Sequence, residues 1–375
     1  PEMTTILIKD ALRQSVEAAS GGLQTVLYTA KGQPSFMNII EKFDLSVIDP
    51  TLSGTHPAFI INGVEVSRIL VGTYTASLIN GELLSLPNRQ PSTPALAAAV
   101  TAARAGGDGF HVMTNAEWSA VQMQCYALGF NPKGNNYYGR DATDSTQYGR
   151  RVDGVSATAG ITTGTPVIYT GSGPVSFRHN NAYNGISDVN GNYNLLTPDV
   201  RLCGATGELH IFANNNAAAG GADLSVSSAG WKAINATTGE LMDLSYTGTP
   251  GVDFVSNLAN SVKILNASAV GNNYTLTATD GAAFSSMANA GAIPVSATAL
   301  AVLKKYGLYP LVANAATLGG DKIVISATTA TAATERMLRR QGSYTDGALA
   351  GVWMAGFNGV RAASGVSAFR VAYYA

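Results

Sequence analysis

Turn-forming residues interrupt this chain so often that none of its regular elements can be long. The sequence contains 41 glycines and asparagine-rich stretches such as GNNYYG and VNGNYN. Glycine adopts a positive φ without steric cost, and the asparagine side chain hydrogen-bonds its own backbone. Two pairs, Asn62-Gly63 and Asn80-Gly81, separate short apolar runs and predict two-residue β-hairpins. The pattern indicates short strands joined by tight, irregular connections.

The composition predicts a sizeable buried core with few charged groups. Hydrophobic residues make up 46% of the chain and charged residues 13%, roughly half the usual charged share. The formal net charge is −1, and basic residues form no cluster that could neutralise phosphates, so we expect no nucleic-acid partner. No apolar run approaches the roughly 18 residues that cross a bilayer, so we expect no membrane insertion. The first residues also lack the basic and apolar regions of a signal peptide.

The clearest predicted helix starts directly after residue 113. Thr114 and Glu117 have the spacing of a capping box, in which each side chain binds the backbone N–H of the other residue. Gly129 is expected to end the helix. The apolar residues that recur at helical spacing, and should share one buried face, are Trp118, Val121, Cys125 and Leu128.

Two further helices are expected on either side of the middle of the chain. The first has Thr93 as its N-cap and Pro94 at its first position, and it stops at Gly106-Gly107. The second runs from Ala297 to Tyr306 with Ser296 as its N-cap. The runs VRLCGATGELHIF, KILNA, NYTLTATD and SAFRVAYY predict strands, the first of them a hairpin.

Composition divides the chain into a short leader and one large domain. Residues 1–42 contain a run, ILIKDALRQSVEAAS, that fits either a strand or a helix, and a strand-like run, LQTVLYTA. They are predicted to form an N-terminal attachment segment. Residues 43–375 are predicted to form the binding domain, with an insertion at about 213–300 that begins with a low-complexity stretch. No repeat of fixed period is visible, which excludes solenoids and propellers.

Few residues are placed to carry out catalysis or to bind a metal. The four histidines are His56, His111, His179 and His210. They lie far apart in the sequence, and no pair has the spacing of two metal ligands on one helix. We therefore expect no metal ligands and no cofactor. Asp141, Asp144 and Asp153 do not follow the ligand pattern of a calcium-binding EF-hand loop, and a solvated loop is expected instead. Cys125 and Cys203 are too few for a disulfide framework and are predicted to be buried thiols of a protein assembled in a reducing cytosol.

The last forty residues combine large aromatic side chains with small neighbours. Tyr344, Trp353 and Phe357 are separated by glycine and alanine, a mixture typical of surfaces that use rigid aromatic anchors for binding. The alternative is that these rings fill the core. From the residue types alone, both interpretations remain open for Trp353, and the core is favoured for Phe369.

The order of these features resembles the C-type-lectin-like fold. Formylglycine-generating enzymes share this fold with the variable receptor-binding proteins of phages and of diversity-generating retroelements. The matching pieces are residues 55–77, 111–125, 134–141, 200–211 and 335–372. The resemblance implies an α+β domain with short irregular strands, two helices and long loops, preceded by the small attachment segment.

The resemblance also assigns roles within the terminal block. Scaffold positions would be Gly342, Tyr344, Gly347, Gly351, Arg361, Phe369 and Arg370. Receptor-binding side chains would be Tyr344, Thr345, Asp346, Ala348, Leu349, Trp353, Ala355, Phe357, Asn358, Val366 and Ser367. The chain departs from the family pattern at Gln341, where the family often has glycine, at Tyr344, where it often has tryptophan, and at Ala368, where it often has glycine.

The same fold class contains enzymes, so the resemblance alone does not decide the function. Formylglycine-generating enzymes use two cysteines near the C-terminus, and this chain has none after Cys203. The clustered histidines of iron-dependent relatives and the Glu-Pro-Asn, Gln-Pro-Asp and Trp-Asn-Asp motifs of calcium-dependent lectins are also missing. We therefore expect a binding protein rather than an enzyme.

The resemblance implies a phage tail receptor-binding protein, or adhesin, possessing a segment that a retroelement could diversify. Its expected partners are a host cell-surface receptor, protein or glycan, and other phage tail or fibre proteins. The protein is expected to form a homo-oligomer, with a trimer as the candidate state. It would assemble in the host cytoplasm and lie in the virion at the tail or fibre tip. The alternatives are an enzyme of the formylglycine-generating type and a structural tail-tip protein without receptor binding.

Overall fold

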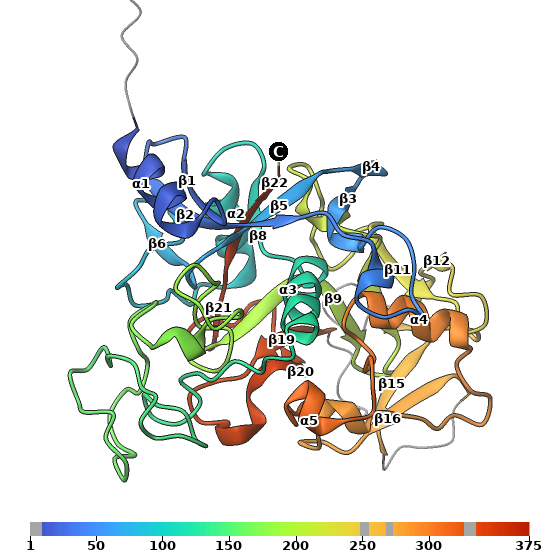
Figure 1. Cartoon of the computed structure of the whole chain (residues 1–375). Helices are drawn as coiled ribbons and strands as arrows, with labels where there is room; N and C mark the ends of the chain where they lie inside the picture. Colours follow the sequence, from blue (N-terminus) through green and yellow to red (C-terminus); the bar gives the residue numbers. More distant parts are fainter. Residues whose placement is uncertain (1–9, 248–254, 268–272, 326–334, 375) are drawn as a thin grey trace, which may run out of the picture.

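A strand from the end of the chain lies inside a sheet rather than at its edge. The computed structural model describes residues 10–247, 255–267, 273–325 and 335–374. Its five-stranded sheet has the order β1-β2-β5-β22-β8. These strands are β1 (Gln24–Tyr28), β2 (Pro34–Glu41), β5 (Arg68–Gly72), β22 (Val371–Tyr374) and β8 (Phe110–Val112). Because β22 pairs antiparallel with both β5 and β8, segments far apart in the sequence share one sheet (Figure 1).

A second sheet of eight strands forms the other half of the molecule. Its order is β12-β11-β10-β9-β19-β20-β18, and β21 pairs with β9 beside this path. The strands are β9 (Asn194–Cys203), β10 (Leu209–Phe212), β11 (Trp231–Ile234), β12 (Leu241–Asp243), β18 (Ile323–Ile325), β19 (Glu335–Gln341), β20 (Gly351–Gly359) and β21 (Ser367–Ala368). The antiparallel pair β9–β10 confirms the hairpin predicted over residues 200–212.

Smaller sheets fill the connections between these two. They comprise β3 (Ile60–Ile61) with β4 (Val64–Glu65), β6 (Ser77–Ile79) with β7 (Glu82–Leu84), β13 (Tyr246–Thr247) with β14 (Val255–Ser256), and β15 (Lys263–Asn266) with β16 (Thr275–Ala278) and β17 (Ala288–Asn289). Both Asn-Gly pairs form the predicted two-residue turns. Asn62 and Asn80 each have φ of 50°, and the glycines that follow have φ of 79° and 81°. Only residues that tolerate this region can occupy both central positions of such a turn.

Five helices occur in the described residues, rather than the two of the expected fold class. They are α1 (Ala11–Ser20), α2 (Leu96–Arg104), α3 (Asn115–Ala127), α4 (Ala297–Lys305) and α5 (Ala315–Leu318). The Ser296 N-cap of α4 is confirmed, since its hydroxyl accepts from the Ala299 N–H. The predicted start of α2 is wrong by two residues: Ala95 is the N-cap, and no side chain caps this helix.

The capping box of α3 is confirmed in both directions. The Glu117 N–H donates to Thr114 Oγ1 at 3.2 Å, and the Thr114 N–H donates to Glu117 Oε2 at 3.0 Å. The predicted burial of Trp118, Val121 and Cys125 is confirmed, but the restriction of buried residues to one face and the inclusion of Leu128 are wrong. Leu128 is 58% exposed because it lies at the C-cap, and ten of the thirteen helical residues are buried, including polar Ser119 and Gln122.

The core lies around α3, which runs between the two main sheets (Figure 1). Trp118 is fully buried, and its indole Nε1 donates to the backbone oxygen of Val352 at the start of β20. A second apolar cluster packs α2 against β5, β8 and β22. Both cysteines are buried free thiols, as predicted.

The structure places the proposed leader and insertion within this architecture. Strands β1 and β2 belong to the sheet that contains β22, so residues 24–41 are part of the domain and the expected boundary at residue 42 is wrong. Strands β11 and β12 extend the eight-stranded sheet. Ile264 and Leu276 lie in the main core cluster. The described residues of the segment 213–300 therefore contribute to the core and to the main sheet. The fold class is a mixed α+β fold rich in strands, as expected at that level.

Candidate functional site

The structure divides the predicted receptor-binding residues into buried and exposed groups. The display prediction is wrong for the following four, whose exposed fractions are 3% or less: Trp353, Ala355, Phe357 and Ser367. The first three alternate along β20 and face the core cluster around α3. The Trp353 ring stacks on Phe284 at 6.3 Å and meets Tyr126 edge-on at 6.4 Å. Small residues between large rings here permit close packing inside a sheet.

The exposed members of the predicted set lie on two loops. Thr345, Ala348 and Leu349 occupy the connection between β19 and β20. Val366 precedes β21 and is 45% exposed. Tyr344, Asp346 and Asn358 are half-buried.

Asp346 supports the β19–β20 loop from within. Its carboxylate accepts from the Ser343 N–H at 2.8 Å and forms an ion pair with Lys322 Nζ at 2.6 Å. The loop is therefore held in one conformation by groups below its surface. The Asp346 side chain therefore links Ser343 of this loop to Lys322.

A second loop, residues 134–141, lies against the first and contributes further tyrosines. The Tyr138 N–H donates to the Tyr344 carbonyl at 3.1 Å, and the Gly347 N–H donates to the Asn136 carbonyl at 2.9 Å. The Tyr344 ring packs edge-on against Tyr193 at 6.0 Å. Tyr137 and Tyr138 make the same kind of contact at 5.2 Å. We call Tyr137, Tyr138, Tyr193, Tyr344 and the loop 345–349 the tyrosine surface.

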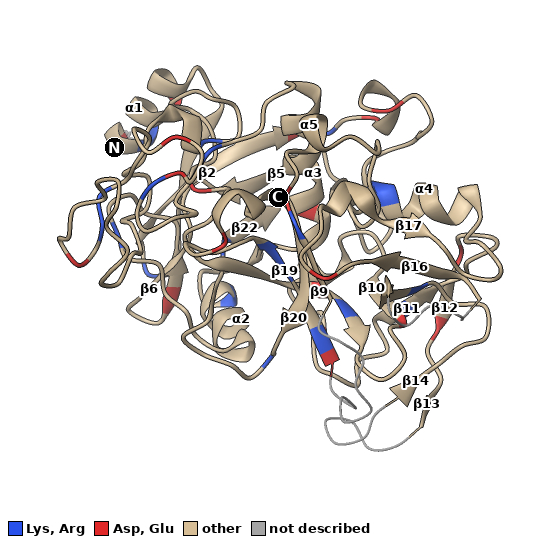
Figure 2. Cartoon of the chain, turned by 90° about the horizontal axis from the view of Figure 1, so that it is seen from below, with Lys and Arg blue, Asp and Glu red and all other residues tan. Residues whose placement is uncertain are grey.

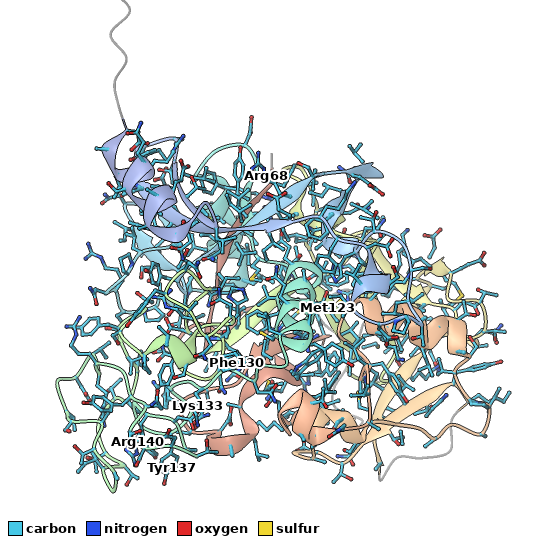
Figure 3. The ribbon with its side chains drawn as sticks, viewed as in Figure 1. Arg68, Met123, Phe130, Lys133, Tyr137 and Arg140 are labelled. Carbon is cyan, nitrogen blue, oxygen red and sulfur yellow. The ribbon has the colours of Figure 1, made fainter. Side chains whose placement is uncertain are left out.

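Sequence reasoning included GNNYYGRD in the resemblance but assigned no contact role to its tyrosines. The available signal was the adjacent Tyr137-Tyr138 pair between asparagine and glycine. Figure 3 shows Tyr137 and Arg140 in the irregular loops away from α3. The Arg140 guanidinium lies 5.1 Å from the Tyr137 ring centre, and Arg140 Nη1 donates to the Ile161 carbonyl at 3.0 Å. This arginine is 3% exposed and fixes the ring above it.

Buried asparagines give these irregular loops a fixed shape. Asn135 is 1% exposed and donates through Nδ2 to the Pro166 carbonyl and to Asn192 Oδ1. Asn136 Oδ1 accepts from the Ala142 N–H at 2.7 Å. Amide side chains here satisfy backbone groups that a helix or sheet would otherwise pair. The tyrosine surface thus stands on a rigid base without regular secondary structure.

The tyrosine surface continues toward the other exposed loop. Tyr193 lines an open hollow of about 460 Å³ together with Leu78 and residues 90–94. The Gly365 N–H donates to the Thr93 carbonyl at 2.8 Å, which brings Val366 to the same region. Gln341, at the position where glycine was expected, has φ of 60°. Its side-chain amide donates to the carbonyls of Gly191 and Tyr193, so this departure from the family pattern holds Tyr193 in place.

The histidines are engaged in internal hydrogen bonds. Burial lowers the pKa of His56 to about 3 and that of His179 to about 4, so both imidazoles are neutral at pH 7. Ser119 Oγ lies 3.2 Å from His56 Nε2, and both residues are completely buried. Within the described ranges, no group of three or more His, Cys, Asp or Glu side chains has the arrangement of a metal site.

The three loop aspartates bind nearby backbone and side-chain groups. Asp141 accepts from the Thr143 N–H, Asp144 accepts from the Thr146 N–H, and Asp153 pairs with Arg151 at 2.6 Å. Asp141 is only 3% exposed, so the expectation of a solvated loop is wrong for this residue.

The protein is a strand-rich α+β fold in which one exposed and three half-buried tyrosines lie together on irregular loops. Comparison of the sequence with protein-family models and with curated proteins gave no match. Figure 2 shows Lys and Arg interspersed with Asp and Glu over many elements. In the part of the chain that the structure describes, none of the helices has the length and apolar character needed to span a bilayer.

Proposed function

We propose that this chain is a phage tail receptor-binding protein with a C-type-lectin-like fold, and that it contacts a host cell-surface receptor through the tyrosine surface. The observation that carries the proposal is the set of tyrosines beside the exposed loop 345–349. They lie on loops whose backbone groups are hydrogen-bonded by buried asparagine side chains. Tyrosine supplies a large contact area and a hydroxyl while losing little side-chain entropy on binding. A rigid base reduces the ordering cost further.

The position of β22 between β5 and β8 supports the finer fold proposal, because it joins segments that are distant in the sequence within one sheet. The proposal also includes attachment to other tail or fibre proteins through the N-terminal part, a trimeric homo-oligomer, a virion location and a loop 345–349 open to retroelement diversification. It assigns no catalytic activity, cofactor or nucleic-acid partner.

The test is binding of the purified chain to host cells. The double variant Tyr137→Ala/Tyr344→Ala should weaken adhesion at least tenfold, since a few aromatic anchors normally supply about 2 kcal/mol or more each. Its melting temperature should stay close to that of the parent, because Tyr137 is 37% exposed and Tyr344 half-buried.

Tyr183→Ala is the matched control, since Tyr183 is 84% exposed and has no ring contact with the tyrosine surface within the described residues. It should leave adhesion unchanged. Equal adhesion of the parent and the double variant would place binding elsewhere on the molecule. Failure of the parent chain itself to bind host cells would favour the structural tail-tip alternative.

A further inference from the structure

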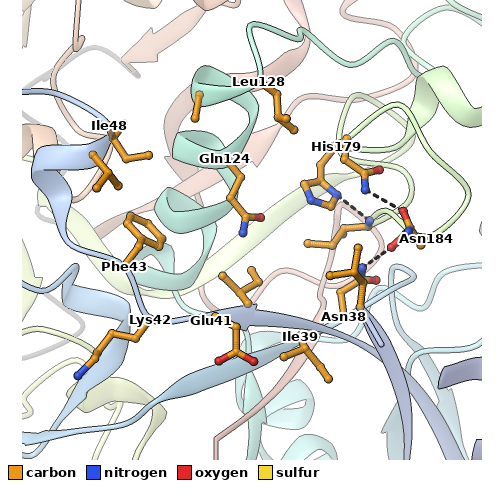
Figure 4. Close-up of a pocket in the computed structure, with 16 residues that line it drawn as sticks. Asn38, Ile39, Glu41, Lys42, Phe43, Ile48, Gln124, Leu128, His179 and Asn184 are labelled. Carbon is orange, nitrogen blue, oxygen red and sulfur yellow. Dashed lines mark hydrogen bonds between the residues drawn. The ribbon is translucent and has the colours of Figure 1, made fainter. Parts of the chain in front are cut away.

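A cavity of about 570 Å³ lies between β2 and the C-terminal end of α3, away from the tyrosine surface. Its size falls within the roughly 300–1,000 Å³ of typical small-molecule sites. The apolar part of its lining includes Phe43, Leu128 and the isoleucines Ile39, Ile40, Ile48 and Ile186. In Figure 4 the Gln124 side chain projects from α3 between Phe43 and His179. We call this space the β2–α3 cavity.

His179 presents a hydrogen-bond donor to the β2–α3 cavity. Its Nδ1 accepts from the Ile186 N–H at 2.8 Å (Figure 4), so that nitrogen carries no proton. Burial, reinforced by the charges of Arg370 and Arg178, lowers the pKa of His179 to about 4 and keeps the ring neutral. A neutral imidazole with an accepting Nδ1 has its proton on Nε2. The residue is 8% exposed, and this N–H has no acceptor among the described residues.

The Gln124 amide lies at the same wall. Its Oε1 is buried without a hydrogen-bond partner in the described part of the chain. Gln124 lines the cavity, and none of the hydrogen bonds among the described residues involves its Nε2. Two neighbouring polar side chains are satisfied instead: Asn38 Nδ2 donates to the Asn184 carbonyl, and Asn184 Nδ2 donates to the Ser20 carbonyl. The donors at this wall are His179 Nε2–H and the Gln124 Nε2 amide, and an acceptor oxygen in the cavity can pair with them. The buried Gln124 Oε1 is itself an acceptor and takes no part in that pairing.

The charges at the mouth of the β2–α3 cavity select against an anion. Lys42 is paired with Glu65 at 2.8 Å. Glu41 lines the cavity, is exposed, and has no ion-pair partner among residues that the structure describes. Arg68 lies opposite Glu41 in register on β5 but forms no ion pair with it among the described residues. A ligand carboxylate would therefore meet the negative charge of Glu41 and two neutral donors. A neutral carbonyl oxygen meets the same donors without that repulsion.

We propose that the β2–α3 cavity binds a neutral, carbonyl-bearing apolar compound or group, such as an N-acyl or ester group. Its carbonyl oxygen accepts from His179 Nε2–H and from the Gln124 amide, and its apolar body packs against Phe43 and the isoleucines. This site goes beyond the proposed receptor binding, involves different residues and does not depend on it.

The binding test uses three probes of similar size with the full chain: acetanilide, benzoate and toluene. Protein-detected NMR titration should give the smallest dissociation constant for acetanilide. Gln124→Met keeps the side-chain length and breaks no hydrogen bond that the described residues make through this side chain. It should weaken acetanilide binding about fivefold, the effect of one hydrogen bond, and leave toluene binding unchanged.

A second measurement examines the tautomer directly. Nitrogen-15 shifts of the His179 ring at pH 7 should show the proton on Nε2. Leu128→Trp is a blocking variant at the exposed edge of the cavity, and it should abolish binding of both neutral probes. Equal affinity for acetanilide and toluene, insensitivity of acetanilide to Gln124→Met, or a proton on Nδ1 would each overturn the proposal.

Discussion

Trp353 is 1% exposed, and its indole Nε1 has no hydrogen-bond partner among the described residues. Trp353→Ala should lower the free energy of unfolding by about 3–5 kcal/mol through the cavity it leaves. Trp353→Phe keeps most of the ring and removes the unpaired N–H, so its cost should be much smaller. Urea denaturation of both variants measures the difference. Equal unfolding free energies for Trp353→Ala and the parent would mean that this ring does not fill the core.

Asp321 makes the unfolding free energy depend on pH. Burial raises the pKa of its carboxyl group to about 8, although the Trp353 N–H donates to Oδ2 at 2.7 Å and opposes the shift. The folded protein keeps this proton, whereas the unfolded chain releases it above about pH 4. This group therefore makes stability fall as pH rises from about 4 to 8.

Asp321→Asn should remove that part of the pH dependence. Urea denaturation of parent and variant at pH 5, 6.5 and 8 gives the two slopes directly. Parallel slopes would show that Asp321 is ionised in the folded protein throughout this range.

The sequence singled out the aromatic residues of the terminal block as candidates for binding. It did not predict which of their side chains are exposed and which are buried. Glycine and alanine beside large rings serve both a binding surface and a tightly packed strand, so the residue types cannot separate Trp353 from Tyr344. The distinction depends on which side of β20 faces α3. That orientation is set by partners far away in the sequence, such as Phe284.

Among the elements, α3 depends most on its cap. Thr114 is completely buried, and its hydroxyl also donates to Asn215 Oδ1 at 2.7 Å. Thr114→Ala should cost about 2 kcal/mol, the upper end of measured cap losses, because it removes both bonds. Thr114→Ser keeps the hydroxyl and should cost less than half as much. A thermal melt comparing the two variants tests this, and identical melting temperatures would contradict the capping role.

The start and end of α3 were predictable because its capping box and Gly129 act locally. Its burial on nearly all sides was not, since polar Ser119 and Gln122 bind the distant carbonyls of Lys305 and Val352. The sequence also gave no sign of a second cap, Asp199, whose carboxylate accepts from the Asn115 and Ala116 N–H groups. Such long-range partners leave no periodic signal.

For the molecule as a whole, residues 213–300 should prove indispensable. Ile264 is completely buried in the main core cluster, so Ile264→Ala should cost about 2–5 kcal/mol. Thr238→Ala, at an exposed position in the same segment, should change stability by less than about 0.5 kcal/mol. Calorimetry of both variants, and of a chain that lacks residues 213–300, provides the test. A cooperative transition in the shortened chain would restore the view of this segment as a separable insertion.

The interior position of β22 has a consequence for how fast the protein folds. Ala372 pairs with Val71, so the ends of a loop of roughly 300 residues must meet, at an entropic cost on the order of 5 kcal/mol. Contacts this distant in sequence slow the crossing of the folding barrier. The two halves of the five-stranded sheet stay unjoined until the intervening chain is largely organised. During that interval the edges of β5 and β8 are unpaired, and this is when the nascent chain is most exposed to aggregation and to chaperones.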